Sequence, residues 1–249
     1  MKVELIDYTG NGCADPARHA ANILVFTKNT RLEMKPGLLK DIESWPQEKI
    51  DKELAYMANT IPSSWEFVEY KFLINGVTRA FTHQFVRTRT GSYAQQTMRV
   101  LDVKGWTYGA GPTVLEGEAG ACYESTMIDI ARAYNDLIKM GAKIEDARGI
   151  LPTNIHTNIV AKFDLRTMAD TARKRASSRT QGEYRSVMEA MKAEVIRVHP
   201  WASLFFGRTF DKSASELEDQ ICNLSRGGKI DEKLKTDMIK LLDAMRTTA

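Results

Sequence analysis

The residues best suited to chemistry lie in one short segment, residues 79–99. It contains four arginines, and the pair Gln95–Gln96 follows shortly after Tyr93. A guanidinium is a planar fork that binds phosphate through two hydrogen bonds, and neutral donors such as Gln, Ser and Thr orient an anion without adding charge. The alternative is a solvated, charged helix face, but the apolar neighbours Phe81 and Phe85 argue against full solvation. The segment therefore predicts a site for a nucleotide phosphate.

Other common catalytic arrangements are not indicated. The three cysteines are widely spaced, none lies in an evidently activating setting, and no CxxC occurs. The four histidines show no HExxH or comparable ligand spacing, and neither GxGxxG nor GxxxxGK[ST] is present. We therefore expect no cysteine nucleophile, no catalytic metal, and no Rossmann or P-loop site.

The composition is that of a soluble globular protein. Hydrophobic residues make up 43% and charged residues 27% of the 249 residues, which is enough apolar content for a sizeable core. The net charge of +3 is too small to indicate nucleic-acid binding by itself. The first residues are acidic where a secretory signal would be apolar, and no run is long enough to span a membrane. We expect a cytoplasmic protein.

Hydrophobic periodicity predicts the elements that position the arginine-rich segment. A strand that ends at Asn75–Gly76, a helix and an extended stretch surround it. In chain order the first part of the sequence predicts a strand at Lys2–Asp7, a helix from Pro16 to about Lys28 capped by Asp15, two short helices between Pro36 and Met57, a strand at Phe67–Ile74, a helix at Val77–Arg87 and extended chain at Ser92–Leu101.

The second part of the sequence is mainly helical. The longest predicted helix carries an apolar stripe that we expect to be core rather than a cofactor site. The predicted elements are helices at Leu115–Lys139, Ile144–Ile150, Arg166–Ser177 and Glu183–Val198, a strand at Asn154–Phe163, and a last amphipathic helix marked by Leu234, Met238, Leu241 and Met245.

Three motifs make a family resemblance specific. Residues 76–99 are similar to G-[IV]-[ST]-R-A-x-x-H-Q-x-V-R-H-R followed by x-x-S-Y-x-Q-Q-S-x-R. Residues 147–154 are similar to A-R-x-x-L-P-x-N, and Arg175 is followed by Gln181 and Glu183. In this order and spacing the chain resembles the flavin-dependent thymidylate synthases, over roughly Lys2 to Phe206.

The resemblance implies a fold and an assembly. The expected class is α/β (α+β), with a central, mostly antiparallel sheet flanked by helices and with extra C-terminal helices. Residues 1–210 would form the family domain and residues 211–249 a helical extension. Members of the family are homotetramers with sites at subunit interfaces, so oligomerisation would be part of catalysis.

The resemblance also implies a reaction. Methylenetetrahydrofolate would donate a one-carbon unit to C5 of dUMP, FAD would deliver a hydride, and NADPH would reduce the flavin, so that no enzyme nucleophile is required. Arg175 would be catalytic, because a permanent positive charge beside the pyrimidine stabilises its deprotonated N3 form. The implied substrate-binding residues are Gln84, Arg87, Gln95, Thr97, Met98, Arg99, Arg148 and Arg175. The implied flavin-binding residues are Ser63, Arg87, Thr88, Arg89, Gln95, Asp164, Arg166 and Asp170.

Several positions depart from the family pattern, mostly around the flavin. Thr88 stands where the R-H-R motif has histidine, and Asp164 and Asp170 occupy usual asparagine positions. Two further imidazoles are missing near residues 60–67, where Thr60–Ile61 replaces a Gly-His pair and Glu66–Phe67 replaces Glu-His. Added carboxylates beside an anionic cofactor cost electrostatic energy unless they are paired, and we expect Arg179 to pair with them.

These departures leave alternatives open. The chain is an active thymidylate synthase with a reshaped flavin site, a related enzyme that acts on dCMP or forms a hydroxymethyl product, or an inactive paralogue. A nucleic-acid-binding module that uses the basic segments 79–99 and 173–185 belongs to a different class. Few aromatic residues lie between those arginines, which argues against the nucleic-acid-binding hypothesis.

Overall fold

The computed structural model describes residues 1–99, 105–175, 180–207, 217, 220–225 and 227–248, with side chains described as far as residue 242. The chain forms two compact units. One consists of Met1–Ala20 and Trp65–His199, and the other of Ala21–Ser64 and Pro200–Ala249. The predicted domain boundary near residue 210 falls within residues 208–216, which lie outside the described part.

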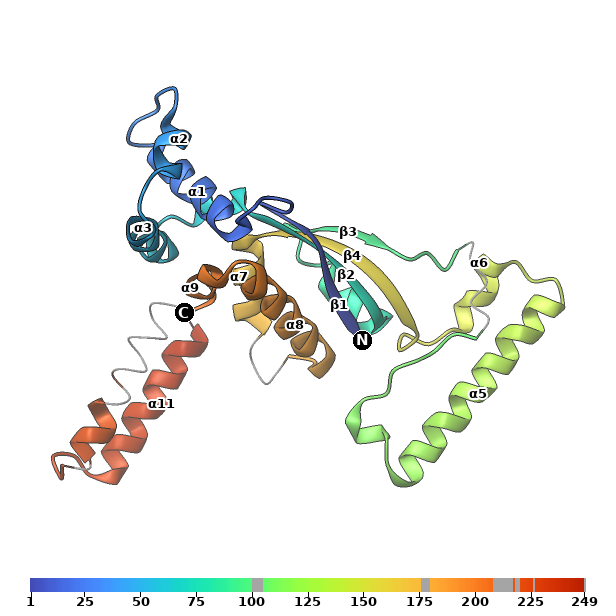
Figure 1. Ribbon diagram of the computed structural model, residues 1–249. Coiled ribbons are helices and arrows are strands. Elements are labelled where there is room, and N and C mark those ends of the chain that lie inside the picture. The colour runs from blue at the N-terminus through green and yellow to red at the C-terminus, as the bar shows by residue number, and fades with distance from the viewer. Residues whose placement is uncertain (100–104, 176–179, 208–216, 218–219, 226, 249) are drawn as a thin grey trace. The chain divides into compact units, whose positions relative to one another are not determined.

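The first unit is built on a four-stranded sheet in the order β1-β2-β4-β3, and every pairing in it is antiparallel. The strands are β1 (Lys2–Tyr8), β2 (Glu69–Thr78), β3 (Ser92–Gln95) and β4 (His156–Asp164). Helices flank this sheet (Figure 1), so the predicted α+β class is confirmed.

Alternation along the two central strands gives the sheet one buried face. Antiparallel sheets commonly cover one face and solvate the other. The buried face is formed by Tyr70, Phe72, Ile74, Ile159, Ala161 and Phe163. The opposite face carries ion pairs, at 2.6 Å between Lys71 Nζ and Asp7 and at 2.5 Å between Lys162 Nζ and Glu69. The core of this unit therefore lies on one side of the sheet.

Helices contact the strands at several points. α4 (Arg79–Phe85) contacts β2 and β4, α7 (Leu165–Arg175) contacts β4, and α8 (Gly182–Val198) contacts β1 and β2. The remaining helical elements of this unit are η2 (Pro112–Val114), α5 (Gly117–Lys139), α6 (Ile144–Ala147) and η3 (Arg148–Ile150). On α5, Met127 and Tyr134 are buried, which agrees with the predicted apolar stripe.

The predicted end of β2 at Asn75–Gly76 is wrong. The pairing with β4 shifts register between Ile74 and Val77, and Gly76 has a φ of 65°. The backbone N–H of Gly76 donates to the side-chain carbonyl of Asn158 at 3.0 Å. This bulge satisfies the unpaired N–H, so the strand continues to Thr78 and α4 starts at Arg79 rather than Val77. Of the predicted extended stretch, Ser92–Gln95 is strand, and residues 100–104 lie outside the described part.

The second unit is helical in its described part. Its elements are most of α1 (Pro16–Asn29), α2 (Leu38–Glu43), α3 (Gln47–Thr60), part of η1 (Pro62–Phe67), η4 (Pro200–Ala202), α9 (Ser203–Phe206) and α11 (Glu232–Thr248). The predicted last helix is confirmed as α11, but its buried face differs. Leu242 and Met238 pack with Ile221, whereas Leu234 and Leu241 are 49% and 66% exposed.

None of the helices in the described part of the chain has the length and apolarity needed to cross a membrane. The same residues contain no group of three or more His, Cys, Asp or Glu side chains placed to hold a metal ion. Cys13 and Cys122 are exposed free thiols, and Cys222 is a half-buried one.

Candidate active site

Helix α4 carries the first half of the arginine-rich segment and is anchored at its start. The Thr78 hydroxyl accepts from the backbone N–H of Phe81 at 3.1 Å, as an N-cap does. That hydroxyl donates in turn to one carboxylate oxygen of Glu183 at 2.5 Å, and the Thr78 backbone N–H donates to the other at 2.8 Å. Glu183 thus ties the start of α4 to the start of α8.

Aromatic packing fixes the orientation of α4. Phe81 and Phe85 are fully buried and stack with ring centroids 4.9 Å apart. Both rings also meet the edge of Tyr184 on α8. Because these side chains hold one face of α4 against the core, Gln84 and His83 are left at the accessible side, and Gln84 donates to the side chain of Gln181 at 2.7 Å.

A tight turn after α4 presents the R-T-R triplet. The Tyr93 hydroxyl donates to the carbonyls of Phe85 at 3.1 Å and Thr88 at 2.8 Å. Burial raises the pKa of Tyr93, so the phenol stays protonated as a donor. A Cβ on Gly91 would lie 2.2 Å from Phe163 Cε1, so only glycine fits this turn. Arg87 and Arg89, within this turn, are both exposed.

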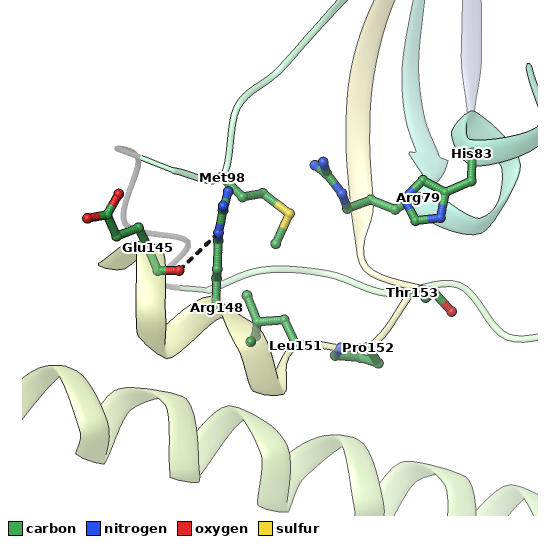
Figure 2. Close-up of a pocket in the computed structure, with 9 residues that line it drawn as sticks. Arg79, His83, Met98, Glu145, Arg148, Leu151, Pro152 and Thr153 are labelled. Atoms are coloured by element: carbon green, nitrogen blue, oxygen red, sulfur yellow. Dashed lines mark hydrogen bonds between the residues drawn. The ribbon is translucent and has the colours of Figure 1, made fainter. Parts of the chain in front are cut away.

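One pocket, termed here the arginine pocket, has a volume of about 270 Å³. It is lined by Arg79, His83, Met98, Glu145, Arg148, Gly149, Leu151, Pro152 and Thr153. Figure 2 shows the Arg79 side chain reaching toward Met98, with Arg148 rising on the other side of Met98. Arg148 Nε donates to the backbone carbonyl of Glu145 at 3.1 Å.

Backbone hydrogen bonds hold the two walls of the arginine pocket together. The N–H of Arg79 donates to the carbonyl of Ile155 at 3.0 Å, and the N–H of Ala80 donates to that of Thr153 at 2.8 Å. Burial lowers the pKa of Arg79, and the positive charge of Arg148 lowers it further. Two guanidiniums therefore share one small pocket and repel each other.

Another pocket, termed here the hydroxyl pocket, has a volume of about 450 Å³. It is lined by Glu66, Thr88, Thr90, Asp164, Arg166, Thr167, Asp170, Thr171 and Lys174. Two of the four threonines, Thr88 and Thr90, come from the turn after α4, whereas most of the charged side chains come from α7. The predicted flavin residues Thr88, Asp164, Arg166 and Asp170 are brought together here.

The charges of the hydroxyl pocket are largely satisfied within it or beside it. Asp164 accepts from the backbone N–H of Thr167 at 2.6 Å and so caps α7. Arg166 pairs with Glu66 at 2.6 Å, and Asp170 pairs with Arg173 on the next turn of the helix. The carboxylates that the sequence placed beside an anionic cofactor are therefore engaged before any ligand binds.

Other predicted site residues lie outside both pocket linings. The Arg175 guanidinium lies over the ring of Tyr184, with its carbon 4.5 Å from the ring centroid. Gln95 donates to the Thr82 hydroxyl at 3.0 Å, and Arg99 Nε is 3.8 Å from the Glu145 carboxylate. The Thr97 hydroxyl accepts from the backbone N–H of Arg99 at 3.1 Å.

One predicted flavin residue belongs to the other unit. The Ser63 hydroxyl accepts a 2.6 Å hydrogen bond from Arg31 there. His83 and Glu145 line the arginine pocket although neither was predicted as a site residue, and Arg79 was predicted only as one of the four arginines of residues 79–99. The spacing of Arg79 and His83 was a usable signal, since residues four apart share a helix face.

Comparison with known proteins assigns the family. The family model described as thymidylate synthase complementing protein matches residues 4–201, which is most of the chain. This chain belongs to that family.

Relatives within the family have names that agree with one another. A flavin-dependent thymidylate synthase of Sulfurisphaera tokodaii is 29% identical over 204 residues, covering 80% of this chain and 75% of the relative. One from Clostridium tetani is 29% identical over 219 residues, covering 80% of this chain and 84% of the relative. One from Nitratidesulfovibrio vulgaris is 32% identical over 154 residues, covering 57% and 63%. The family resemblance drawn from the motifs is confirmed.

Thr88, Asp164 and Asp170, which depart from the family pattern, line the hydroxyl pocket. Thr88 lines this pocket where the family's R-H-R motif has histidine. Asp164 caps α7, a task that Asp and Asn perform about equally well, so this replacement preserves the local structure. Arg179, which we expected to pair with the added carboxylates, lies outside the described residues, and Asp170 has Arg173 as a partner.

Proposed function

We propose that this chain is a flavin-dependent thymidylate synthase that forms dTMP from dUMP. Methylenetetrahydrofolate transfers its one-carbon unit to C5 of the pyrimidine, NADPH supplies the reducing equivalents, and tetrahydrofolate and NADP⁺ leave. The observation that carries the proposal is the pair of pockets along α4 and the turn after it. One pocket has two guanidiniums for an anion, and the other has hydroxyls and paired charges. The names of the family relatives agree with this reaction.

The arginine pocket suits the nucleotide phosphate. Met98 and Arg148, two of the residues that the family resemblance assigns to the nucleotide, line it together. Charge-assisted hydrogen bonds from guanidinium to phosphate are short and strong. Gln84, Arg87 and the stretch Gln95–Arg99 would hold the nucleotide, in part from a neighbouring subunit of a homotetramer.

The hydroxyl pocket suits a flavin in its donor set. Thr88, Thr90, Thr167 and Thr171 offer neutral donors, and Lys174 offers an exposed positive charge toward a pyrophosphate. The neighbouring carboxylates are already engaged, so that they repel an anion less than free ones. FAD bound there would supply the hydride. Arg87, Arg89, Gln95 and Ser63 would complete this site across subunits.

Arg175 is the residue proposed to act on the pyrimidine. Its guanidinium lies over the Tyr184 ring, a cation–π contact that would help to orient the planar fork. A fixed positive charge beside N3 stabilises negative charge that develops on the ring. An enzyme that works in this way requires no cysteine nucleophile.

The test is to identify the product. Purified protein is incubated with FAD, NADPH and methylenetetrahydrofolate, with dUMP and dCMP offered separately, and the nucleotides are analysed by mass. The proposal predicts dUMP gaining the mass of a CH₂ group. A methylated dCMP or a hydroxymethylated base would replace the proposed reaction with a related one, and no product at all would indicate an inactive paralogue.

The matched variants are Arg175→Gln and Arg197→Gln. Both remove one positive charge, but Arg197 is exposed on α8 and pairs with Glu194. The proposal predicts that only Arg175→Gln loses turnover, by about 100- to 1,000-fold if it resembles the loss of an oxyanion donor. Equal turnover in the two variants would remove Arg175 from the catalytic role.

A further inference from the structure

Arg79 has a buried guanidinium nitrogen without an acceptor in the described part of the chain, which is rare in folded proteins. Its side chain is half-buried, and its Nη1 atom is fully buried with no hydrogen-bond partner among the described residues. A guanidinium has five N–H donors and no way to lose its charge near neutral pH. Because a buried cationic donor without an acceptor is costly, an unmet donor of this kind points to a missing anion.

The surroundings of Arg79 increase that cost rather than reduce it. Arg148 shares the pocket, and its positive charge lowers the pKa of Arg79 beyond the effect of burial. Glu145 is the carboxylate in the lining, but it lies 3.8 Å from Arg99 Nε, and it is the Glu145 backbone carbonyl that accepts from Arg148 Nε. The pocket is therefore cationic in its ligand-free form.

Hydrogen bonds from distant parts of the chain fix the backbone at Arg79. Its backbone N–H is bonded to Ile155, and the preceding Thr78 is held twice by Glu183. The root of the side chain is thus fixed by three hydrogen bonds from two distant parts of the chain. In Figure 2 the Arg79 side chain extends away from His83 toward Met98.

The chemistry of the pocket favours a phosphate monoester. Two guanidiniums on opposite walls can each present two donors to a tetrahedral dianion. The volume of about 270 Å³ lies just under the usual range of about 300–1,000 Å³ for a complete ligand site, which suits one end of a nucleotide. Met98 and Leu151 add apolar wall, so that the attraction acts partly shielded from water.

We propose that Arg79 is a phosphate-binding residue that acts with Arg148 on the dianionic phosphate of the nucleotide. The identity of the nucleotide rests on the proposed function, whereas the phosphate chemistry rests on the pocket. Binding would give both guanidiniums an anionic partner and offset the repulsion between the two arginines. Phosphate therefore stabilises the folded protein as well as being held by it.

The experiment compares Arg79→Gln, Arg79→Lys and the surface control Arg197→Gln by calorimetric titration with dUMP and with deoxyuridine. Losing a charged hydrogen-bonding partner weakens dUMP binding about 10- to 100-fold in Arg79→Gln. Arg79→Lys, which keeps the charge but not the fork, falls between Arg79→Gln and wild type. Deoxyuridine binding changes less than twofold in every variant. Similar losses for both ligands, or a dUMP affinity within twofold of the Arg197→Gln control, would overturn the proposal.

Inorganic phosphate separates this inference from the proposed function. Phosphate added to a chloride buffer of equal ionic strength raises the melting temperature of wild type and of Arg197→Gln, but not of Arg79→Gln. If wild type binds no dUMP yet shows this pattern, the proposed function fails and the role of Arg79 stands. If phosphate stabilises Arg79→Gln as much as wild type, the role of Arg79 fails whatever the nucleotide.

Discussion

The arginine pocket and the hydroxyl pocket differ in how their charges are compensated. In the arginine pocket, Arg79 and Arg148 face each other, and Nη1 of Arg79 has no acceptor among the described residues. In the hydroxyl pocket, Arg166 is paired with Glu66, and Asp170 is paired with Arg173. We expect a pocket with uncompensated positive charge to favour a compact anion. We expect a pocket whose charges are paired to favour a large cofactor held by many weaker contacts.

We expect the greatest loss on replacing Glu183, which anchors the start of α4 through Thr78. Glu183→Ala leaves the backbone N–H and the hydroxyl of Thr78 without their acceptor, at a cost of about 1–3 kcal/mol for each buried group. Because α4 leads into both pockets, we expect dUMP and flavin affinities to fall together. Chemical denaturation and two titrations measure this. Glu183→Gln, which retains one acceptor, is the milder control, and loss of only one affinity would show that the pockets are anchored separately.

A second prediction uses a buried histidine that lines neither pocket. His199 Nε2 donates to the Thr9 carbonyl at 3.1 Å, so Nδ1 accepts from the Tyr70 hydroxyl at 2.9 Å and the ring is neutral. Burial lowers the pKa of His199 to about 4 from 6.5. Between these values the unfolded chain binds the proton and the folded one does not. The contribution of neutral His199 to the free energy of unfolding is therefore fully present above about pH 6.5. It is lost as the pH falls toward 4, by about 3 kcal/mol.

Urea denaturation at a series of pH values tests the His199 prediction. The slope of unfolding free energy between about pH 4 and 6.5 should flatten in His199→Asn relative to wild type. An unchanged slope would assign the acid sensitivity to other groups. Because His199 lines neither pocket, ligand affinities at pH 7 should change little in this variant.

A third prediction disturbs the hydroxyl pocket alone. A methyl group at Gly91 would press on the buried ring of Phe163 and on the Tyr93 hydroxyl, at 2.2 and 2.6 Å. Overpacking of this kind costs about 1–3 kcal/mol. The turn that moves carries Thr88 and Thr90, so Gly91→Ala should weaken flavin binding more than dUMP binding. Equal weakening would mean that the disturbance spreads through α4.

We expect the smallest change from a variant that leaves a positive charge unpaired in the hydroxyl pocket, as in the arginine pocket. Glu66→Gln removes the partner of Arg166, an exposed pair worth at most about 1 kcal/mol to stability. Arg166 is then free to meet an anionic cofactor, and flavin binding should tighten about two- to fivefold while dUMP binding stays constant. Fluorescence quenching of the flavin measures the change. Weaker flavin binding would instead give Glu66 a direct role in holding the cofactor.

The sequence predicted what depends on local pattern. The alternation Tyr70, Phe72, Ile74 located β2, and the cap at Asp15 located α1, because period and capping act over a few residues. It missed the bulge after Ile74, which depends on the Asn158 side chain 82 residues from Gly76. Such a partner has no local signature.

The same limit applies to the site. The family resemblance indicated Met98 and Arg148 of the arginine pocket, and Thr88, Asp164, Arg166 and Asp170 of the hydroxyl pocket. It did not show that Glu183 accepts hydrogen bonds from Thr78 across 105 residues, nor that Arg166 pairs with Glu66 across 100 residues. The charge balance of a pocket is a property of three-dimensional neighbours. It was therefore accessible only once the fold brought the segments together.

An anaerobic single turnover tests the proposed flavin-dependent reaction most sharply. Protein with bound, chemically reduced FAD is mixed with dUMP and methylenetetrahydrofolate, without NADPH, while the visible absorbance of the flavin and the nucleotide products are followed. The account predicts that flavin oxidation and dTMP appear together, with one dTMP for each flavin oxidised. A flavin that stays reduced while dUMP is consumed, or is not consumed at all, would contradict it.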